Sequence, residues 1–488
     1  MIRDRWLWAI LLLGAAVRLY GLGERSLSYD ECQQYWASQG NVLISNREIT
    51  LDPPLFALLL RVQSLAGHGE TWLRLLPCLL GILGIPAVYS LGLRVTGEAA
   101  TARAAAFFFA LAPYPIRYSQ SLRVYSLTLL LCALLPAAWV AAMEEVFPAR
   151  RLRLAVLACA GLLGMYGVIW LAGSLLMVGL ILPSASAFEN RLRTAIALGA
   201  GLAAAIPLYL YSLPAQMSRG TPSYFYEDKF LPLDSLAGAL LFVGQGLLGL
   251  AGFFSYIHPA SALLFGALAL LGMALLARRP SARALVCVFA LAVGAAAAAS
   301  SFRLYPFGAT RQMLYAAPLF YVFASHGIVA LRQRFRGWLT LGCLSAMVVG
   351  CGIFMVRYHT EPGGQEMRPV IGYLARHALP SDRILVNKDA IPQFRFYYAG
   401  DPGAVVWGRQ TVIRDYVSEV NDILASDRSA RWWLIFSHGW SDERRQALRS
   451  LDPGFTLQDH FEAQRAAAFL YVPSPDGAPS SSSLGPRP

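Results

Sequence analysis

An acidic pair, Asp30-Glu31, follows the first hydrophobic segment of the chain, residues 6–22, within the sequence SLSYDECQQYWAS. Carboxylates beside a membrane are costly to desolvate and are usually kept for a function. A carboxylate that reaches a hydroxyl proton can act as a general base, and Asp30 is our candidate for that role. The alternative is a solvated loop pair or the first turn of a helix, where acids favour the positive end of the helix dipole.

A second carboxylate, Asp52, stands directly before two prolines, Pro53 and Pro54. Proline fixes its own φ angle and disfavours a helical conformation in the preceding residue, so we expect Asp52 to be held rigidly near the membrane. From there Asp52 can line a polar cavity. The alternative is that it only caps a helix formed by residues 54–67.

The segment YSQSLRVY, residues 118–125, places Arg123 at the beginning of a long uncharged stretch. A guanidinium group at that position needs an anionic partner, and Asp30, Glu31 or a bound phosphate would provide one. The alternative is that the long side chain reaches the membrane surface and is solvated there.

A third group of polar residues surrounds the sequence YPFGAT. Arg303 and Arg311 have planar guanidinium groups that suit phosphate oxygens, and Tyr305 lies between them. Arginine and tyrosine also anchor helices at membrane interfaces, which is the alternative interpretation. Among the histidines, which show no metal-type spacing, we single out His258 because it begins an expected helix.

The composition indicates that these residues are positioned by a membrane bundle. Of 488 residues, 56% are hydrophobic and 14% are charged, whereas soluble proteins carry about a quarter charged residues. A spanning helix needs about 20 apolar residues. We expect eleven such helices, at 6–22, 72–93, 102–118, 122–142, 152–167, 169–185, 194–213, 259–277, 283–300, 312–331 and 338–356.

The arginines orient this bundle. The net charge is +12, and loops rich in arginine stay in the cytosol. All arginine-rich loops share one side if 54–67 and the Gly-rich 235–256 lie at the outer face without crossing. The N-terminus is then cytosolic, and Asp30, Asp52 and Arg123 collect on the outer face.

The composition changes near residue 357. Residues 1–356 form the expected membrane domain, with outer loops at 23–71 and 214–258, and residues 357–472 form a small mixed α/β domain outside the membrane. The remaining residues, 473–488, are rich in proline and serine and are expected to be disordered.

Local patterns within the C-terminal domain predict its elements. RILVN (383–387) and RWWLIFS (431–437) are expected strands. Residues 367–379 and 442–451 are expected amphipathic helices.

Several classes of function are disfavoured. The seven cysteines show no metal-type CxxC, and no P-loop or dinucleotide-binding motif follows a strand. Binding of nucleic acid is not expected, because the arginines are scattered among membrane loops instead of clustered on one face. We therefore expect that the chemistry does not use a soluble nucleotide as its energy source.

Taken together, the motifs resemble those of the GT-C superfamily of membrane glycosyltransferases. More narrowly, they resemble bacterial glycosyltransferase family 39, the group of protein O-mannosyltransferases and lipid A aminoarabinose transferases. Tyr29-Asp30-Glu31 matches the family's acidic motif, and Asp52-Pro53-Pro54-Leu55 matches its x-Pro-Pro-Leu element. The segment 118–125 corresponds to Tyr-Ser-Gln-Glu-Ala-Arg-x-Tyr, and 311–314 to an Arg-Tyr-Leu-like element. The resemblance covers about residues 6–400.

The resemblance implies inverting transfer of a sugar from a polyprenyl-phosphate donor to an acceptor hydroxyl or phosphate. Asp30 would be the base, and Glu31 would position Asp30 or bind the acceptor or a metal. The donor phosphate would be bound by Arg123, Arg311, Arg303 and Tyr305. Ser121 and Leu122 stand where the family has Glu-Ala, and Asp52 would supply the missing negative charge.

The resemblance also sets the remaining expectations. The acceptor or cavity residues would be Asp52, Tyr29, Tyr35, Tyr118, Gln120 and His258. A divalent ion (Mg, Mn or Zn) bound by Asp30 and Asp52 is left open. The partners would be the donor lipid, membrane lipid and an envelope acceptor, at a bacterial inner membrane. Two alternatives remain, a transporter or flippase, which would carry mid-membrane charges and repeats, and a catalytically silent scaffold.

Overall fold

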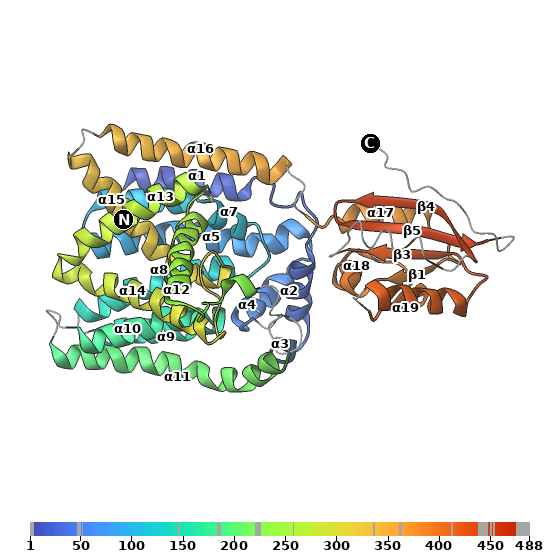
Figure 1. Cartoon of the computed structure of the whole chain (residues 1–488), viewed down its shortest axis with the longest axis horizontal. Helices are drawn as coiled ribbons and strands as arrows, with labels where there is room; N and C mark the ends of the chain where they lie inside the picture. The colour runs from blue at the N-terminus through green and yellow to red at the C-terminus, as the bar shows by residue number, and fades with distance from the viewer. Residues whose placement is uncertain are drawn as a thin grey trace. The chain divides into compact units, whose positions relative to one another are not determined.

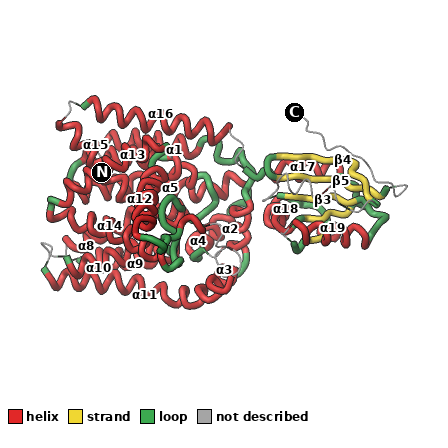
Figure 2. The backbone as a smooth tube through the Cα atoms, in the orientation of Figure 1, coloured by secondary structure: helices red, strands yellow, loops and turns green. Residues whose placement is uncertain are grey.

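The chain folds into two units. The computed structural model describes residues 4–474 except 46–49, 51, 145–146, 183–186, 220–225, 257, 335–336, 361–363, 411–412, 438–447, 449–450 and 452–453. One unit is helical and comprises Met1–Leu22 and Ala37–His359. The other comprises Gly23–Trp36 and Thr360–Pro488, so part of the first predicted outer loop folds with the C-terminal region. Figure 2 shows strands only in this second unit.

The helical unit contains the long apolar segments (Figure 1). Its elements are α1 (Arg5–Leu19), the end of α2 (Tyr29–Gln39), α3 (Val42–Ser45), α4 (Leu55–Ser64), α5 (Glu70–Thr96), α6 (Ala99–Leu111), α7 (Pro113–Ser119), α8 (Tyr125–Glu144), α9 (Pro148–Gly164), α10 (Val168–Ile181), α11 (Phe188–Arg219), the 3-10 helix η3 (Glu227–Lys229), α12 (Leu236–Phe254), α13 (Pro259–Ala277), α14 (Pro280–Ser301), the 3-10 helix η4 (Arg311–Ala316), α15 (Ala317–Arg334) and α16 (Trp338–Thr360).

All eleven predicted spans fall in helical segments, but 102–118 is divided between α6 and α7, and 312–331 begins in η4 and continues as α15. Among the described residues, eight helical segments are long and apolar enough to cross a membrane, so the chain is a multi-pass membrane protein. Four predicted spans are shorter, in α1, α6, α9 and α10. The spans predicted at 152–167 and 169–185 are two separate helices, because α9 ends at Gly164 and α10 begins at Val168.

The Gly-rich segment predicted not to cross forms α12, a single helix of 19 residues. Its length and hydropathy would allow it to span a membrane. In Figure 1, however, α12 runs across the direction of the long helices α11 and α16. This orientation favours the interpretation that α12 lies along the membrane surface.

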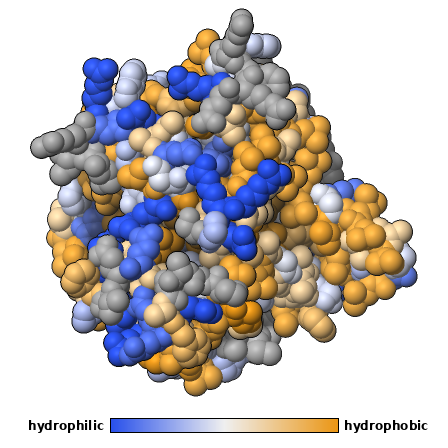
Figure 3. All heavy atoms as spheres, turned by 90° about the vertical axis from the view of Figure 1, so that its left-hand side faces the viewer, coloured by the Kyte–Doolittle hydropathy of each residue, from blue (hydrophilic) through white to orange (hydrophobic). Residues whose placement is uncertain are grey.

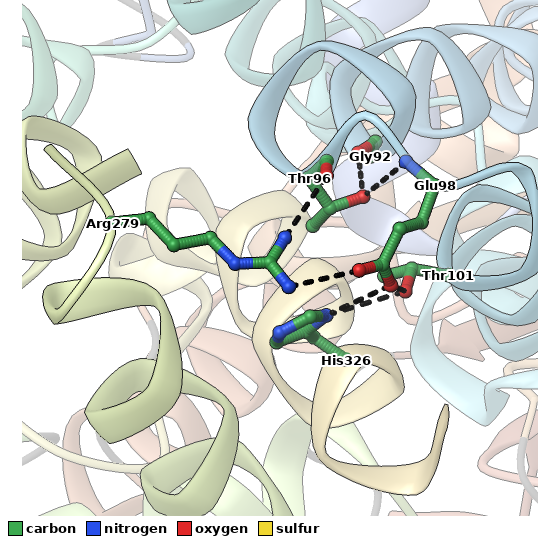
Figure 4. A network of polar contacts seen from close by, with 6 residues as sticks. All are labelled: Gly92, Thr96, Glu98, Thr101, Arg279 and His326. Carbon is green, nitrogen blue, oxygen red and sulfur yellow. Dashed lines mark hydrogen bonds and ion pairs between the residues drawn. The ribbon is translucent and has the colours of Figure 1, made fainter. Parts of the chain in front are cut away.

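Polar side chains gather at one end of the helical unit. Figure 3 looks onto this end, at the left of Figure 1, and shows hydrophilic side chains surrounded by hydrophobic ones. A network that links three helix ends is drawn in Figure 4: Arg279 donates to the Glu98 carboxylate over 3.0 Å and to the Thr96 carbonyl over 3.2 Å. The buried His326 of α15 lies 3.5 Å from the same carboxylate. These contacts connect α5, α6, α14 and α15.

The second unit is built on a five-stranded mixed sheet of order β2-β1-β3-β5-β4. Strands β1, β2 and β3 are parallel, and β5 pairs antiparallel with both β3 and β4. Its elements are the beginning of α2, α17 (Met367–His377), β1 (Arg383–Val386), η5 (Lys388–Ala390), α18 (Ile391–Tyr397), η6 (Pro402–Ala404), β2 (Val405–Trp407), α19 (Ile413–Ser426), β3 (Trp432–Phe436), β4 (Phe455–Ala463) and β5 (Ala466–Pro473).

Helices cover both faces of this sheet, which makes the domain mixed α/β as predicted. Trp433 and Ile435 of β3 pack with α17 and α18, whereas Trp432 and Leu434 pack with α19. All five residues of β3 are buried, as expected for a strand covered on both faces. The predicted strands 383–387 and 431–437 and the predicted helix 367–379 are confirmed. The predicted helix 442–451 lies almost entirely, and the tail 473–488 largely, outside the described residues.

Candidate active site

The acidic pair occupies the first turn of α2. Ser28 precedes the helix, and its amide donates to Glu31 Oε2 over 2.9 Å, while its hydroxyl accepts from the amide of Glu31 over 3.4 Å. These reciprocal bonds form a capping box, which satisfies donors that a helix start leaves open. Glu31 is buried and Asp30 is half-buried. Glu31 therefore shapes the helix start that carries Asp30.

Tyr29 lies within an acidic environment that sequence reasoning found only in part. Burial raises the pKa of the Tyr29 phenol, and the charges of Asp389 and Asp30 raise it further. Gln33 donates to the Tyr29 hydroxyl over 2.9 Å. Asp389 was missed by the sequence analysis, although it lies two residues after the predicted strand at 383–387. Charged residues at the carboxyl end of a parallel strand are a recognisable signal for a site.

The segment before and after Asp30 is bound by residues of the C-terminal region. The amide of Tyr29 donates to Gln365 Oε1 over 2.7 Å. The ring of Tyr35, which is buried, packs edge-on against Phe396 at 5.1 Å between centroids. Tyr35 was predicted to line a cavity, and the structure uses its ring for packing.

In the helical unit, two arginines converge on Tyr125. The guanidinium of Arg123 lies 5.8 Å from the centroid of the Tyr125 ring, and that of Arg311 lies 5.9 Å from it. Arg123 is also 3.0 Å from the Asp52 carboxylate. The structure thus brings together three predicted residues from three separate motifs. Asp52 does not cap α4, whose first residue follows Pro54 with no side-chain cap.

Gln120 has a positioning role that its motif did not reveal. Its side-chain amide donates to the carbonyl of Tyr20 over 2.6 Å and to that of Arg18 over 3.1 Å, so it closes the C-terminal end of α1. The neighbouring Ser119 accepts from the fully buried Arg18 over 3.1 Å. Arg18 was missed by the sequence analysis, and the signal was a charge inside an apolar span. Tyr118 is buried against Tyr114 and Tyr125.

Three predicted residues make local contacts elsewhere in the helical unit. The guanidinium of Arg303 lies over Phe230 at 5.7 Å, and the residue adopts a positive φ of 55°. The hydroxyl of Tyr305 donates to the carbonyl of Gln312 over 2.7 Å. His258 caps α13, because its Nδ1 accepts from the amide of Ala260 over 3.2 Å. None of these contacts involves Tyr125.

A divalent ion bound by Asp30 and Asp52 was left open by the sequence. Within the described ranges, no three His, Cys, Asp or Glu side chains are grouped to hold a metal ion. Asp52, one of the two proposed ligands, is paired with a cation, Arg123.

Two cavities lie away from these residues. A cavity of about 530 Å³ is lined by Gly40, Asn41, Val42, Leu43, Leu58 and Arg61. In the second unit, a cavity of about 630 Å³ lies at the end of β2 beside Trp407 and Asp422. Neither contains a predicted site residue.

The fold is shared with solved membrane proteins. No protein-family model matches the sequence, and no curated protein sequence matches it. The structure of ArnT from Cupriavidus metallidurans bound to undecaprenyl phosphate is similar, with 14% identity, a TM-score of 0.62 and coverage of 99% of each chain. The Archaeoglobus fulgidus oligosaccharyltransferase in complex with Zn and sulfate has 12% identity and a TM-score of 0.60, over 96% of this chain and 73% of that one.

A further structure of the Archaeoglobus oligosaccharyltransferase AglB, in complex with an inhibitory peptide and a dolichol-phosphate, has 11% identity and a TM-score of 0.53, over 98% of this chain and 74% of that one. The chain therefore has the fold of the ArnT and AglB structures. At these identities the likeness establishes the fold.

Proposed function

We propose that the protein is an inverting glycosyltransferase that moves a sugar from a polyprenyl-phosphate donor to an acceptor hydroxyl. The observation that carries this proposal is the convergence of Arg123 and Arg311 on Tyr125. Two guanidinium groups from distant segments form a site suited to phosphate oxygens. The GT-C fold supports the same conclusion, because the similar ArnT structure is bound to undecaprenyl phosphate.

The proposed reaction requires a base and a stabilised leaving group. Asp30 accepts the proton of the acceptor hydroxyl as that oxygen attacks the anomeric carbon of the sugar. The bond between this carbon and the phosphate oxygen breaks, with inversion at the carbon. The electron pair leaves with the polyprenyl phosphate, whose growing negative charge Arg123 and Arg311 stabilise. The proton remains on Asp30 until it is lost to water.

The remaining polar residues act on the residues named above and have no direct part in the chemical step. Asp52 sets the orientation of Arg123 through their ion pair. Gln120 and Ser119 hold the end of α1, from which the loop bearing Asp30 departs. The ordinary pKa of tyrosine, about 10, keeps the Tyr29 hydroxyl protonated at neutral pH and available for hydrogen bonding. We place the protein in a bacterial inner membrane with the sheet domain outside, on the basis of the arginine-rich loops.

The test uses purified full-length protein in lipid vesicles with a panel of polyprenyl-phosphate sugars and an envelope extract. We expect release of polyprenyl phosphate with one donor, and a loss of about 100-fold or more in Asp30→Asn. Donor binding should persist in this variant, because the phosphate site is intact. Absence of turnover with every donor, or turnover unaffected by Asp30→Asn, would refute the proposal.

The same assay separates the two alternatives. A transporter or flippase would move labelled lipid across the vesicle membrane without cleaving the sugar–phosphate bond. A catalytically silent scaffold would bind donor lipid without turnover and would be indifferent to Asp30→Asn. The observation that disfavours a scaffold is the concentration of predicted catalytic-motif residues around Tyr125.

A further inference from the structure

We propose that the C-terminal sheet domain positions the catalytic loop, through a clamp formed by Gln365, Glu366, Gln393 and Tyr397. In this proposal the four clamp residues are positioning residues for Asp30. The inference rests on the proposed function of Asp30 as the base. It assigns to the sheet domain a role in turnover.

The clamp binds the backbone just before Asp30. The amide of Ser26 donates to Glu366 Oε2 over 3.1 Å, and the amide of Leu27 donates to the Tyr397 hydroxyl over 2.6 Å. The amide of Tyr29 donates to Gln365 Oε1 over 2.7 Å, and the carbonyl of Leu27 accepts from Gln393 Nε2 over 2.8 Å. With the capping bond from Ser28 to Glu31, four consecutive amides have side-chain acceptors.

Side chains of the loop add contacts on both sides of Asp30. The hydroxyl of Ser26 donates to Glu366 over 2.7 Å, and Leu27 is fully buried. Six residues after Asp30, the indole of Trp36 donates to the carbonyl of Pro392 over 2.9 Å, and Arg395 lies over its ring at 5.0 Å. The helix turn that carries Asp30 is therefore bound to the domain at both ends.

The clamp residues are themselves fixed to the sheet. The amide of Glu366 donates to the carbonyl of Gln464, between β4 and β5, over 2.9 Å. Gln393 is fully buried, and its Oε1 accepts from the hydroxyl of Ser437, directly after β3. The position of residues 26–29 is thus determined by the packed sheet. A catalytic carboxylate must stay within about 0.5 Å of its productive position, and a rigid support of this kind can hold it there.

The test compares two tyrosine variants of the full-length protein in vesicles. Tyr397→Phe keeps the aromatic ring and removes the hydroxyl that accepts from the Leu27 amide. Tyr373→Phe is the matched control, because it removes a hydroxyl that donates to Asp459 over 2.7 Å in the same unit. Hydrogen exchange of the amides of residues 26–29 reports the clamp, and kcat and KM for the donor report catalysis.

We expect Tyr397→Phe to accelerate exchange at Leu27 by about tenfold or more. It should lower kcat by about 10- to 100-fold with KM unchanged within about twofold, because misplacing the base affects the chemical step. Glu366→Ala should act in the same direction, and Glu366→Gln should recover part of the rate because one acceptor oxygen remains. Tyr373→Phe should match the wild type in all three measurements.

Two results would overturn the inference. One is faster exchange in Tyr397→Phe with an unchanged kcat, and the other is a lower kcat with no change in exchange. If Glu366→Ala does not fold, the isosteric Tyr397→Phe decides alone. Failure of the proposed function is distinct, because it would appear as an inactive wild type or an active Asp30→Asn.

Discussion

The guanidinium of Arg123 lies 3.0 Å from the carboxylate of Asp52, and this ion pair joins two motifs that the sequence keeps apart. The side chain of Arg123 is 9% exposed and that of Asp52 is 27% exposed. Removing one member of such a pair leaves a poorly solvated charge, which costs more than the pair itself contributes. The pair therefore ties the diproline segment to the start of α8.

Asp52→Asn should lower the free energy of unfolding by about 1–3 kcal/mol, because Arg123 loses its counter-charge. Arg123→Gln should lower it as well, and the double variant should lose less than the sum of the two. The expected coupling is at least about 0.5 kcal/mol. Thermal unfolding in detergent, followed by tryptophan fluorescence, measures all four proteins. Strictly additive losses would contradict a direct ion pair.

Arg311→Lys should weaken the binding of polyprenyl phosphate by about tenfold. Lysine keeps the charge but cannot present the planar fork that binds two phosphate oxygens. Binding is measured with a labelled polyprenyl phosphate in vesicles at constant ionic strength. The matched control is Arg153→Lys, an exposed arginine of α9, which should bind as the wild type does. Equal affinities for Arg311→Lys and the control would argue against a phosphate site at Arg311.

Glu31→Gln should retain most of the turnover that Asp30→Asn abolishes. Glutamine keeps an oxygen that accepts from the Ser28 amide, so the capping box survives. Glu31→Ala removes that acceptor and should destabilise the start of α2 by about 1 kcal/mol. The initial rates of the wild type and these variants are compared with the donor that the vesicle assay identifies. If Glu31→Gln were as inactive as Asp30→Asn, Glu31 would have a chemical role beyond capping.

Glu98 should make the stability of the protein depend on pH in the acid range. Burial raises the pKa of Glu98, but hydrogen bonds from Arg279 and Thr101 and the charges of His326 and Arg279 outweigh burial and lower it overall. A carboxylate with a depressed folded-state pKa contributes stability that is complete above its unfolded pKa of about 4.3. That contribution is lost as the pH falls through the folded-state value.

The melting temperature of the wild type should therefore fall more steeply below about pH 4.3 than that of Glu98→Gln. The difference between the two should be largest above this pH, where the wild type keeps the Arg279 contact as an ion pair. Glu144→Gln, an exposed carboxylate at the end of α8, is the control and should follow the wild type. Parallel melting curves for wild type and Glu98→Gln across this range would rule out the contribution.

In the first outer loop, local sequence patterns predicted some features of the structure but not the contacts between distant residues. The acidic pair was recognised from its position after an apolar span, and its place in the first turn of a helix was one of the stated alternatives. The S-x-x-E capping pattern of Ser28 and Glu31 is local and was available in the sequence. The partner of Ser26 could not be recognised from the sequence, because Glu366 is 340 positions away.

Within the YSQSLRVY segment, the sequence also predicted the setting of one residue, Arg123, but not the contact of another, Gln120. Its polar character predicted a site, and the guanidinium groups of Arg123 and Arg311 both lie over the ring of Tyr125. Gln120 was predicted to line the cavity because it belongs to the same motif as Arg123. In the structure its side-chain amide instead donates to the carbonyls of Arg18 and Tyr20 at the end of α1. Those carbonyls become acceptors only once α1 and α7 pack together, so no pattern within the motif could identify the contact.

The sequence by itself determined the class of the protein: a membrane bundle followed by a mixed α/β domain, with its buried strands and its acidic and basic motifs. Long apolar runs and the alternation of β-branched or aromatic residues are local signals of membrane helices and buried strands. They can be read without knowing which other segments pack against them. Only the tertiary structure decided that Arg123 pairs with Asp52 and that residues 23–36 fold with the C-terminal domain. These pairings depend on which surfaces meet after folding, and local propensity carries no information about partners hundreds of residues apart.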